Sequence, residues 1–199
     1  MNRILLIGAG HAHLAVLRSL KGEPLLGARF AIATTGAKQI YSGMLPGVIA
    51  GHYRRHEAEV DVARLAEAAY AEFIEGEAVK LDPAQKLVKL ADGTELEFDL
   101  VSINVGSLVE RSIPGAHFAL PVKPYEAFYD RLRTAKVNRV AIAGAGVSGA
   151  EIAMALRHRG ALVTLYSEKP TLPPRVVKQL RRRKVDYRPA MPRPVCGSQ

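Results

Sequence analysis

A strand–glycine–helix pattern occurs twice in this sequence, at residues 2–20 and again at 138–156. Each copy has a run of aliphatic residues, then the triplet Gly-Ala-Gly, then a segment with helical character, and the glycines align at an offset of 136. A continuous aliphatic run is typical of a buried parallel strand. The repeat therefore predicts two α/β units of the same type in one chain.

The two glycine turns predict two binding sites for dinucleotides. Gly8 and Gly10 in the first copy, like Gly144 and Gly146 in the second, allow a tight turn that a pyrophosphate can approach closely. The helix after each turn directs its free N–H groups and the positive end of its dipole at that phosphate. The alternative is a glycine turn in an α/β domain that binds no phosphate. Two copies in one chain make the dinucleotide interpretation the stronger one.

The third position of the Gly-x-Gly-x-x-Gly fingerprint differs between the copies. Gly149 supplies it in the second copy, where a glycine permits close packing of the helix on the strand. His13 stands there in the first copy, with His11 also beside the turn. Two interpretations of His13 stay open: it contacts the cofactor, or it packs or caps the helix, and the second is favoured.

The end of the second strand in each unit predicts how the adenosine ribose is held. The strand at 29–34 ends in Thr34, followed by Thr35, where an acid is usual, so uncharged hydroxyls would face the ribose. Glu168 lies 24 residues after Gly144, where an acid accepts both ribose hydroxyls and repels a 2′-phosphate. This favours NADH over NADPH at the second site, although Lys169 weakens the repulsion.

The stretch between the two copies changes character twice. Residues 40–53 are rich in glycine and nearly free of charge, which fits either close packing on a flat aromatic ligand or a buried connection. Residues 60–72 predict a helix and 73–98 a small antiparallel meander. The remaining expected elements are a buried strand at 99–105, a linker at 114–124, helices at 125–136, 147–159 and 172–184, and strands at 139–143 and 161–166.

Charge and cysteine content exclude several classes of protein. The net charge is +9, but residues 170–199 hold eight cations and one acid, so the basic character belongs to the C-terminal stretch. We expect a solvated face there, with contact to anionic lipid or RNA as the lesser alternative. Cys196 is the only cysteine, which excludes an internal disulfide, a CxxC pair and a thiolate cluster.

Metal binding and membrane insertion are not expected. The histidines outside the first turn have no ligand spacing, so we expect no metal site. No stretch reaches the about 20 apolar residues of a spanning helix. The single cysteine makes a cytoplasmic setting the default expectation, with peripheral contact at the inner face of the membrane as a further option.

The order of these features resembles the two-dinucleotide flavoprotein oxidoreductases. More narrowly, GAGHAHL at 8–14, YSGMLPGVIAGHY at 41–53 and SINVGS at 102–107 resemble pyridine nucleotide-disulfide oxidoreductases similar to type II NADH dehydrogenases. The same module also occurs fused to selenophosphate synthetases. The resemblance extends from residue 1 to about 184, and YSGMLPG is its most specific part. It implies FAD on the first unit and NAD(P)H on the second, with hydride passing from nicotinamide to flavin.

The resemblance also implies where each cofactor is held. For FAD these are the first glycine turn, the segment near the isoalloxazine and a later turn: Gly8, Ala9, Gly10, His11, His13, Thr34, Thr35, Tyr41, Ser42, Gly43, Met44, Pro46, Gly106 and Ser107. For NADH they are Gly144, Gly146, Gly149, Glu151 and Glu168. For Glu151 the alternative is an acid on the helix surface without a ligand. No catalytic acid or base is assigned, because the flavin carries the hard step and the protein positions the two rings.

Two departures from the family pattern shape the functional expectation. The cysteine pair that faces the flavin in disulfide reductases is absent here, so electrons would leave to a quinone, a dye, oxygen or another acceptor. Family members also continue well beyond this length, so we expect a C-terminally truncated member. The expected domains are an FAD-binding domain at 1–124, a partial NAD(P)H-binding domain at 125–184 and a disordered tail at 185–199.

The sequence as a whole predicts an α/β fold with two Rossmann-like units, the second incomplete, and a small antiparallel meander. The expected function is that of an FAD-dependent NAD(P)H oxidoreductase. The alternative is a catalytically inactive nucleotide-binding or interaction module. No nucleic-acid partner is expected, and the oligomeric state stays open.

Overall fold

The computed structural model describes residues 1–23, 25–109, 115–169 and 172–189. By compactness these residues form two units. The first contains Met1–Gln39 and Glu59–Ser107, and the second contains Ile40–Ala58 and the described part of Leu108–Gln199. The expected domains at 1–124 and 125–184 concern what the chain binds, and they stay a prediction.

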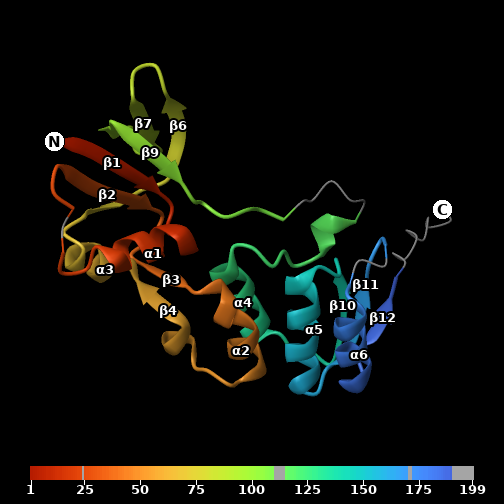
Figure 1. The fold of residues 1–199 in the computed structure, drawn as a ribbon. Helices are drawn as coiled ribbons and strands as arrows, with labels where there is room; N and C mark the ends of the chain where they lie inside the picture. Colours follow the sequence, from red (N-terminus) through yellow and green to blue (C-terminus); the bar gives the residue numbers. More distant parts are fainter. Residues whose placement is uncertain (24, 110–114, 170–171, 190–199) are drawn as a thin grey trace. The chain divides into compact units, whose positions relative to one another are not determined.

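The first unit is built on a four-stranded parallel sheet with the strand order β5-β2-β1-β9 (Figure 1). The strands are β1 (Asn2–Ile7), β2 (Ala28–Thr34), β5 (Glu72–Glu75) and β9 (Leu100–Ile103). Ile7 of β1 is in register with Ala33 of β2 and with Ile103 of β9. Three strands therefore end at the same carboxyl edge, and the segments that follow them meet there.

Helices cover one face of this sheet. They are α1 (His11–Ser19) and α3 (Val62–Ala68), and they pack through Leu17, Val62 and Ala66 onto Leu6 and Ile32 of the sheet. Asp61 caps α3, because its carboxylate accepts a hydrogen bond from the Arg64 amide at 3.0 Å. These are the amphipathic segments that the sequence predicted, although α3 ends earlier than expected and β5 follows it.

The antiparallel meander covers the other face of the sheet. Its strands are β6 (Ala78–Asp82), β7 (Leu87–Leu90) and β8 (Glu95–Glu97). Val88, Leu96 and Phe98 pack against Leu5 and Ala31 of the parallel sheet. A separate two-stranded sheet pairs β3 (Lys38–Ile40) with β4 (Glu59–Asp61). The expected meander is thus present from β6 to β8, but its expected start at 73–75 is wrong, because these residues belong to β5 and pair in parallel with β2.

Strand β9 differs from its prediction. We expected a buried strand, but Leu100 is 54% exposed and Ile103 is 57% exposed. The reason is its position, because β9 is the edge strand of the described sheet and only β1 pairs with it there. Its aliphatic composition indicated a strand correctly and burial incorrectly.

The second unit holds a three-stranded parallel sheet with the order β10-β11-β12. The strands are β10 (Arg139–Ala143), β11 (Leu162–Tyr166) and β12 (Asp186–Arg188). Its helices are α2 (Leu45–Ala50), α4 (Tyr125–Thr134), α5 (Val147–His158) and α6 (Pro174–Arg182), with 3-10 turns η1 (Ser42–Met44), η2 (Arg55–Ala58) and η3 (Ala116–Phe118). Together the two parallel units and the meander give the α/β, Rossmann-like fold that was predicted.

The expected tail at 185–199 needs a correction at its start. Asp186–Arg188 form β12 and pair with β11, and Val185 before them is 4% exposed. The short strand escaped prediction because three residues carry too little periodicity. The rest of the expected tail, 190–199, lies outside the described residues.

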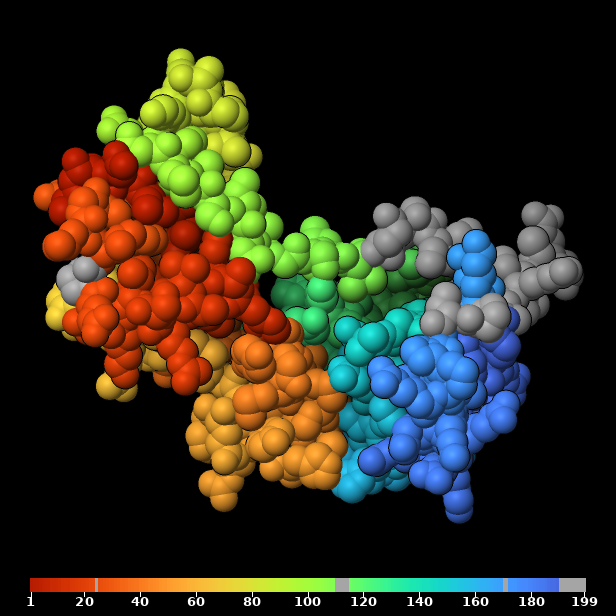
Figure 2. All heavy atoms as spheres, viewed as in Figure 1, coloured from red at the N-terminus to blue at the C-terminus, as the bar shows by residue number. Residues whose placement is uncertain are grey.

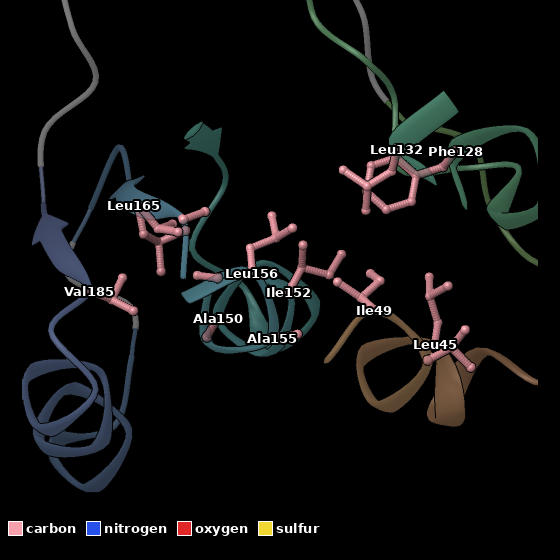
Figure 3. Packing of buried hydrophobic residues seen from close by; sticks show 14 of the residues in the cluster. Leu45, Ile49, Phe128, Leu132, Ala150, Ile152, Ala155, Leu156, Leu165 and Val185 are labelled. Carbon is pink, nitrogen blue, oxygen red and sulfur yellow. The ribbon is translucent and has the colours of Figure 1, made fainter. Parts of the chain in front are cut away.

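A single apolar cluster forms the core of the second unit. Figure 3 shows Ile49 of α2 pointing toward Ile152 of α5, with Phe128 and Leu132 of α4 nearby. In Figure 2 the orange atoms of the α2 segment lie directly against the cyan atoms of α5. The glycine-rich segment therefore contains a packed helix, which the sequence did not predict because Gly and Pro interrupt its apolar pattern.

Candidate nucleotide-binding sites

The first glycine turn lies at the carboxyl end of β1. Gly8 has a left-handed backbone with φ +83°, which a side chain would strain, and its amide donates to the Ala33 carbonyl of β2 at 2.7 Å. Gly10 then precedes α1, and its amide donates to the Asn104 carbonyl at 3.0 Å. The turn is thus bonded to the strands on both sides of β1.

Helix α1 begins without a side-chain cap. Gly10 makes no side-chain hydrogen bond as the N-cap, and the first turn contains no acidic residue. The first amide of the helix with a helical acceptor is that of Leu14, which donates to the Gly10 carbonyl at 3.1 Å. Because a helix leaves its first amides without intrahelical acceptors and its dipole is positive there, this end suits a phosphate.

His13 is buried beneath the turn, with 2% of its surface exposed. Its Nδ1 lies 2.6 Å from the Gly8 carbonyl oxygen and its Nε2 lies 2.9 Å from Ser102 Oγ on β9. Both ring nitrogens thus have partners inside the protein. Of the two open interpretations, these contacts favour packing.

Asn104 is a residue of this site that the sequence analysis missed. A side chain added at Gly10 would collide with the Asn104 side chain, and one added at Gly8 would lie 2.6 Å from the Asn104 carbonyl oxygen. The Asn104 Oδ1 atom is buried and has no hydrogen-bond partner among the described residues. No local pattern marks Asn104, because only the parallel pairing of β1 with β9 brings it to the turn.

The other candidate residues of the first unit lie at or near the same edge of the sheet. Thr34 is buried, and its hydroxyl accepts a hydrogen bond from Gln39 Nε2 at 2.6 Å, whereas Thr35 is exposed. Of the two threonines, Thr35 is therefore the one accessible to a ribose. Gly106, with φ +78°, and Ser107 follow β9 and are both exposed.

The second glycine turn repeats the backbone of the first. Gly144 has φ +104°, and its amide donates to the Tyr166 carbonyl of β11 at 3.0 Å. Gly146 precedes α5 without a side-chain cap, and no acid lies in the first turn of that helix. Two helix ends suited to an anion thus follow two left-handed glycines, which is the arrangement that the repeated sequence predicted.

The two turns differ in what surrounds them. A side chain at Gly146 would meet nothing within 4 Å among the described atoms, in contrast to Gly10. A side chain at Gly149 would collide with the Gly144 carbonyl oxygen, so Gly149 permits the close approach expected of the third glycine.

Glu168 and Glu151 are both exposed in the second unit. Glu168 follows the carboxyl end of β11, and β11 ends level with β10, since Tyr166 is in register with Ala143. The buried hydroxyl of Ser167 donates to the Lys169 carbonyl, which fixes the backbone on both sides of Glu168. The acid thus stands at the same sheet edge as the second glycine turn.

Two glycines of the glycine-rich segment at 40–53 pack against tyrosines of the same segment. A side chain at Gly43 would lie 3.0 Å from the Tyr41 ring, and one at Gly47 would lie 2.6 Å from the Tyr53 ring. The segment is anchored at its start, since the Ile40 amide donates to Glu126 Oε1 at 3.0 Å and the Tyr41 amide donates to the Ala58 carbonyl at 2.7 Å. Leu45, Val48 and Ile49 are buried. These contacts support the buried connection, and contact with a flat ligand stays a prediction for Tyr41, Ser42, Gly43, Met44 and Pro46.

Potential metal ligands lie apart from one another in the described part of the chain. There, no three His, Cys, Asp or Glu side chains converge as metal ligands, and His52 and His158 form an exposed ring pair with centroids 4.8 Å apart. No helix among these residues combines the length and the apolar character needed to cross a membrane. The cations at 175–188 are exposed while Leu180 is buried. A solvated face and a face for anionic lipid or RNA would both look like this, so the expected solvated face stays a prediction.

Comparison with solved structures supports the fold. Reduced CoADR-RHD of Bacillus anthracis has a TM-score of 0.76 at 18% identity, sulfide:quinone oxidoreductase of Aquifex aeolicus 0.68 at 19%, and NADH:rubredoxin oxidoreductase of Clostridium acetobutylicum 0.72 at 21%. Each match covers 94% of this chain but only 38%, 51% and 52% of the respective solved chain. The chain thus spans about half the length of these structures or less.

Sequence comparison gives the family. No curated protein sequence matches the chain. A family model described as pyridine nucleotide-disulphide oxidoreductase matches residues 2–188, a range that includes both glycine turns and the YSGMLPG segment. The chain therefore belongs to the pyridine nucleotide-disulphide oxidoreductase family.

Proposed function

We propose that this chain is an FAD-dependent NAD(P)H oxidoreductase, with FAD on the first glycine turn and NADH on the second. The observation that carries the proposal is the repeated geometry: in each unit a left-handed glycine at the end of a parallel strand leads into a helix without a cap. Each such end can bind a pyrophosphate through backbone amides and the helix dipole. When bound, the flavin would accept a hydride from the nicotinamide and pass the electrons to an acceptor.

At the first site the chain's own groups would bind and orient FAD. The amides at the start of α1, from His11 to His13, would hold the pyrophosphate, and Thr35 would reach the ribose. Gly106 and Ser107 would form a second contact after β9. The segment Tyr41–Pro46 would contribute the surface that orients the isoalloxazine. No acidic side chain lies in the first turn of α1 to repel the phosphate, which supports this assignment.

At the second site the residues fit a nicotinamide dinucleotide. Among the described residues, no atom lies within 4 Å of a side chain placed at Gly146, so a pyrophosphate can approach the backbone there. Glu168 would accept the two ribose hydroxyls, which favours NADH over NADPH because its charge repels a 2′-phosphate. Glu151, exposed in the first half of α5, would face the nicotinamide end.

The electrons would leave to an external acceptor. Cys196 is the only cysteine, so the chain has no cysteine pair to be reduced by the flavin. Similar solved structures include a sulfide:quinone oxidoreductase, a water-forming NADH oxidase and an NADH:rubredoxin oxidoreductase. By that likeness we propose a quinone, oxygen or a small redox protein as the acceptor class.

The test uses the full 199-residue chain, incubated with FAD and separated from free cofactor. We expect bound flavin absorbance, and reduction of a redox dye that depends on NADH and is lost in Gly8→Val, where a side chain would collide with Asn104. Glu95→Gln, on the exposed face of the meander, is the matched control and should retain both properties. A chain that stays colourless in FAD and reduces no dye would overturn the proposal.

A second candidate is a nucleotide-binding module without turnover. It is supported by the same repeated turns, which account for binding of a phosphate and not for turnover. Calorimetric titration separates the candidates: binding of FAD and NADH without reduction of any dye supports the module, and dye reduction excludes it.

A further inference from the structure

The third fingerprint position faces the same backbone group in both turns. In the second turn Gly149 lies so close to the Gly144 carbonyl that a side chain would collide with it. In the first turn His13 occupies this position, and the corresponding carbonyl, that of Gly8, lies 2.6 Å from the imidazole Nδ1. A hydrogen bond thus stands where the second turn has only a close glycine contact.

The two contacts of His13 define its tautomer. A carbonyl oxygen only accepts, so Nδ1 must carry the proton that is donated to Gly8. In the neutral ring Nε2 is then an acceptor, and the Ser102 hydroxyl at 2.9 Å donates to it. With 2% of its surface exposed, His13 has both polar atoms satisfied inside the protein.

The two hydrogen bonds of His13, one to Gly8 and one to Ser102, connect the turn to β9. Ser102 is in register with Leu6 of β1, two residues before the turn, so the anchor lies in the sheet itself. Two further bonds hold the turn, because the Gly8 amide donates to Ala33 and the Gly10 amide to Asn104. The His13 bond acts on the Gly8 carbonyl and so on the left-handed peptide from which the turn starts.

We propose that His13 is a positioning residue for the pyrophosphate of FAD: as its Nδ1–H tautomer it links the Gly8 carbonyl to Ser102 and holds the first glycine turn in its binding conformation. The inference rests on the proposed function of the first turn as the FAD site. His13 touches no phosphate in this role. It acts by removing the cost of ordering the turn when the ligand arrives, which is how preorganisation raises affinity.

The first test reads the tautomer without any cofactor. Long-range ¹⁵N–¹H correlation spectra of the imidazoles distinguish Nδ1–H from Nε2–H rings, and the signal of His13 among the six histidines is the one missing in His13→Asn. We expect an Nδ1–H ring in alkaline buffer, and a shift of the Nε2 resonance in Ser102→Ala. An Nε2–H ring would overturn the inference.

The second test measures FAD affinity by quenching of flavin fluorescence in graded variants. Losing one net hydrogen bond corresponds to about five- to tenfold weaker binding, so we expect that loss in His13→Ala. His13→Asn places an amide where Nδ1 stood and should recover most of the affinity, whereas His13→Gln, which reaches only toward Ser102, should not. Ser19→Ala, which removes an exposed hydroxyl at the far end of α1, is the control.

The outcomes separate this inference from the proposed function. A folded His13→Ala that binds FAD as tightly as the wild type, or Asn and Gln variants that behave alike, overturns the positioning role. Should His13→Ala fail to fold, Ser102→Ala decides the matter by the same two readouts, and unchanged affinity with an unchanged His13 resonance counts against it. A wild type that binds no FAD ends the proposed function and this role with it, whatever the tautomer.

Discussion

The Asn104 carbonyl accepts the Gly10 amide at 3.0 Å, while the Asn104 side chain fills the space that a side chain at Gly10 would need. Gly10 is thus required by the folded protein itself before any ligand is considered. The matching glycine of the second turn, Gly146, has no such neighbour among the described residues. The same residue type in the same motif therefore serves two different physical needs.

Gly10→Ala is expected to destabilise the chain, and Gly146→Ala is expected to leave its stability nearly unchanged. Overpacking against Asn104 should cost about 1–3 kcal/mol of unfolding free energy, since backbone and side chain must both move. Urea titration followed by circular dichroism measures the difference. Equal losses in the two variants would show that the space around Gly146 is not open.

Gly149→Ala is expected to lower stability by a similar amount, about 1–3 kcal/mol, because the new methyl group meets the Gly144 carbonyl oxygen. Its matched control is Ser148→Ala, the exposed neighbour on the same helix. Thermal unfolding of both variants gives the comparison. A Gly149→Ala protein as stable as the control would contradict the close approach of α5 to the turn.

Glu168→Ala should weaken NADH binding about tenfold, because charge-assisted hydrogen bonds to the ribose are lost. NADPH binding should improve at the same time, since the negative charge no longer opposes a 2′-phosphate. Glu168→Gln keeps an acceptor without the charge and should fall between the two for NADH. Titration of each variant with both nucleotides is the measurement, and an unchanged ratio of affinities would remove Glu168 from the site.

Glu126→Ala should loosen the start of the YSGMLPG segment. The Ile40 amide then loses the carboxylate that accepts its hydrogen bond, in a region where Ile40 itself is 6% exposed. Hydrogen exchange at the Ile40 amide should accelerate, whereas Glu126→Gln, which retains an acceptor, should change it less. Identical exchange in wild type and Glu126→Ala would show that the bond does not hold the segment.

Asp92 should make the meander sensitive to acid. The Thr94 amide donates to Asp92 Oδ1 at 2.9 Å, and this bond lowers the pKa of Asp92 below its ordinary value of 3.8. Because the folded pKa lies below the unfolded one, the contribution to stability is present above 3.8 and is lost as pH falls through the folded pKa. Asp92→Ala should reduce the free energy of unfolding at neutral pH. It should also make that free energy depend less on pH in the acid range. Unfolding curves across this pH range, with Asp82→Ala as the comparison, measure it.

Local patterns predicted the turns but not the contacts that complete them. The aliphatic run, Gly8 and the following helix lie within one short stretch, so their geometry follows from neighbouring residues. Asn104 and Ser102 are about 90 residues away in sequence, and they reach the turn only because β9 pairs in parallel with β1. No periodicity in a single sequence specifies that pairing, so the partner of His13 could not be read from it.

For the glycine-rich segment at 40–53, composition predicted the environment but not the neighbouring side chains. Its low charge correctly indicated a sheltered environment, and Leu45 and Ile49 are buried there. Its glycines suggested room for a ligand, but at two of them the neighbouring atoms belong to tyrosines of the segment itself. Composition can report that space is needed at Gly43 and Gly47, but not what fills it.

Those two rings have an optical consequence. The sequence contains seven tyrosines and no tryptophan, so all of its intrinsic ultraviolet emission comes from phenol rings, and Tyr41 and Tyr53 supply two of the emitters. Both lie on the glycines of one short segment and are partly exposed. A chromophore bound at this segment would quench the tyrosine fluorescence by energy transfer. The intrinsic fluorescence of the protein would therefore report its binding.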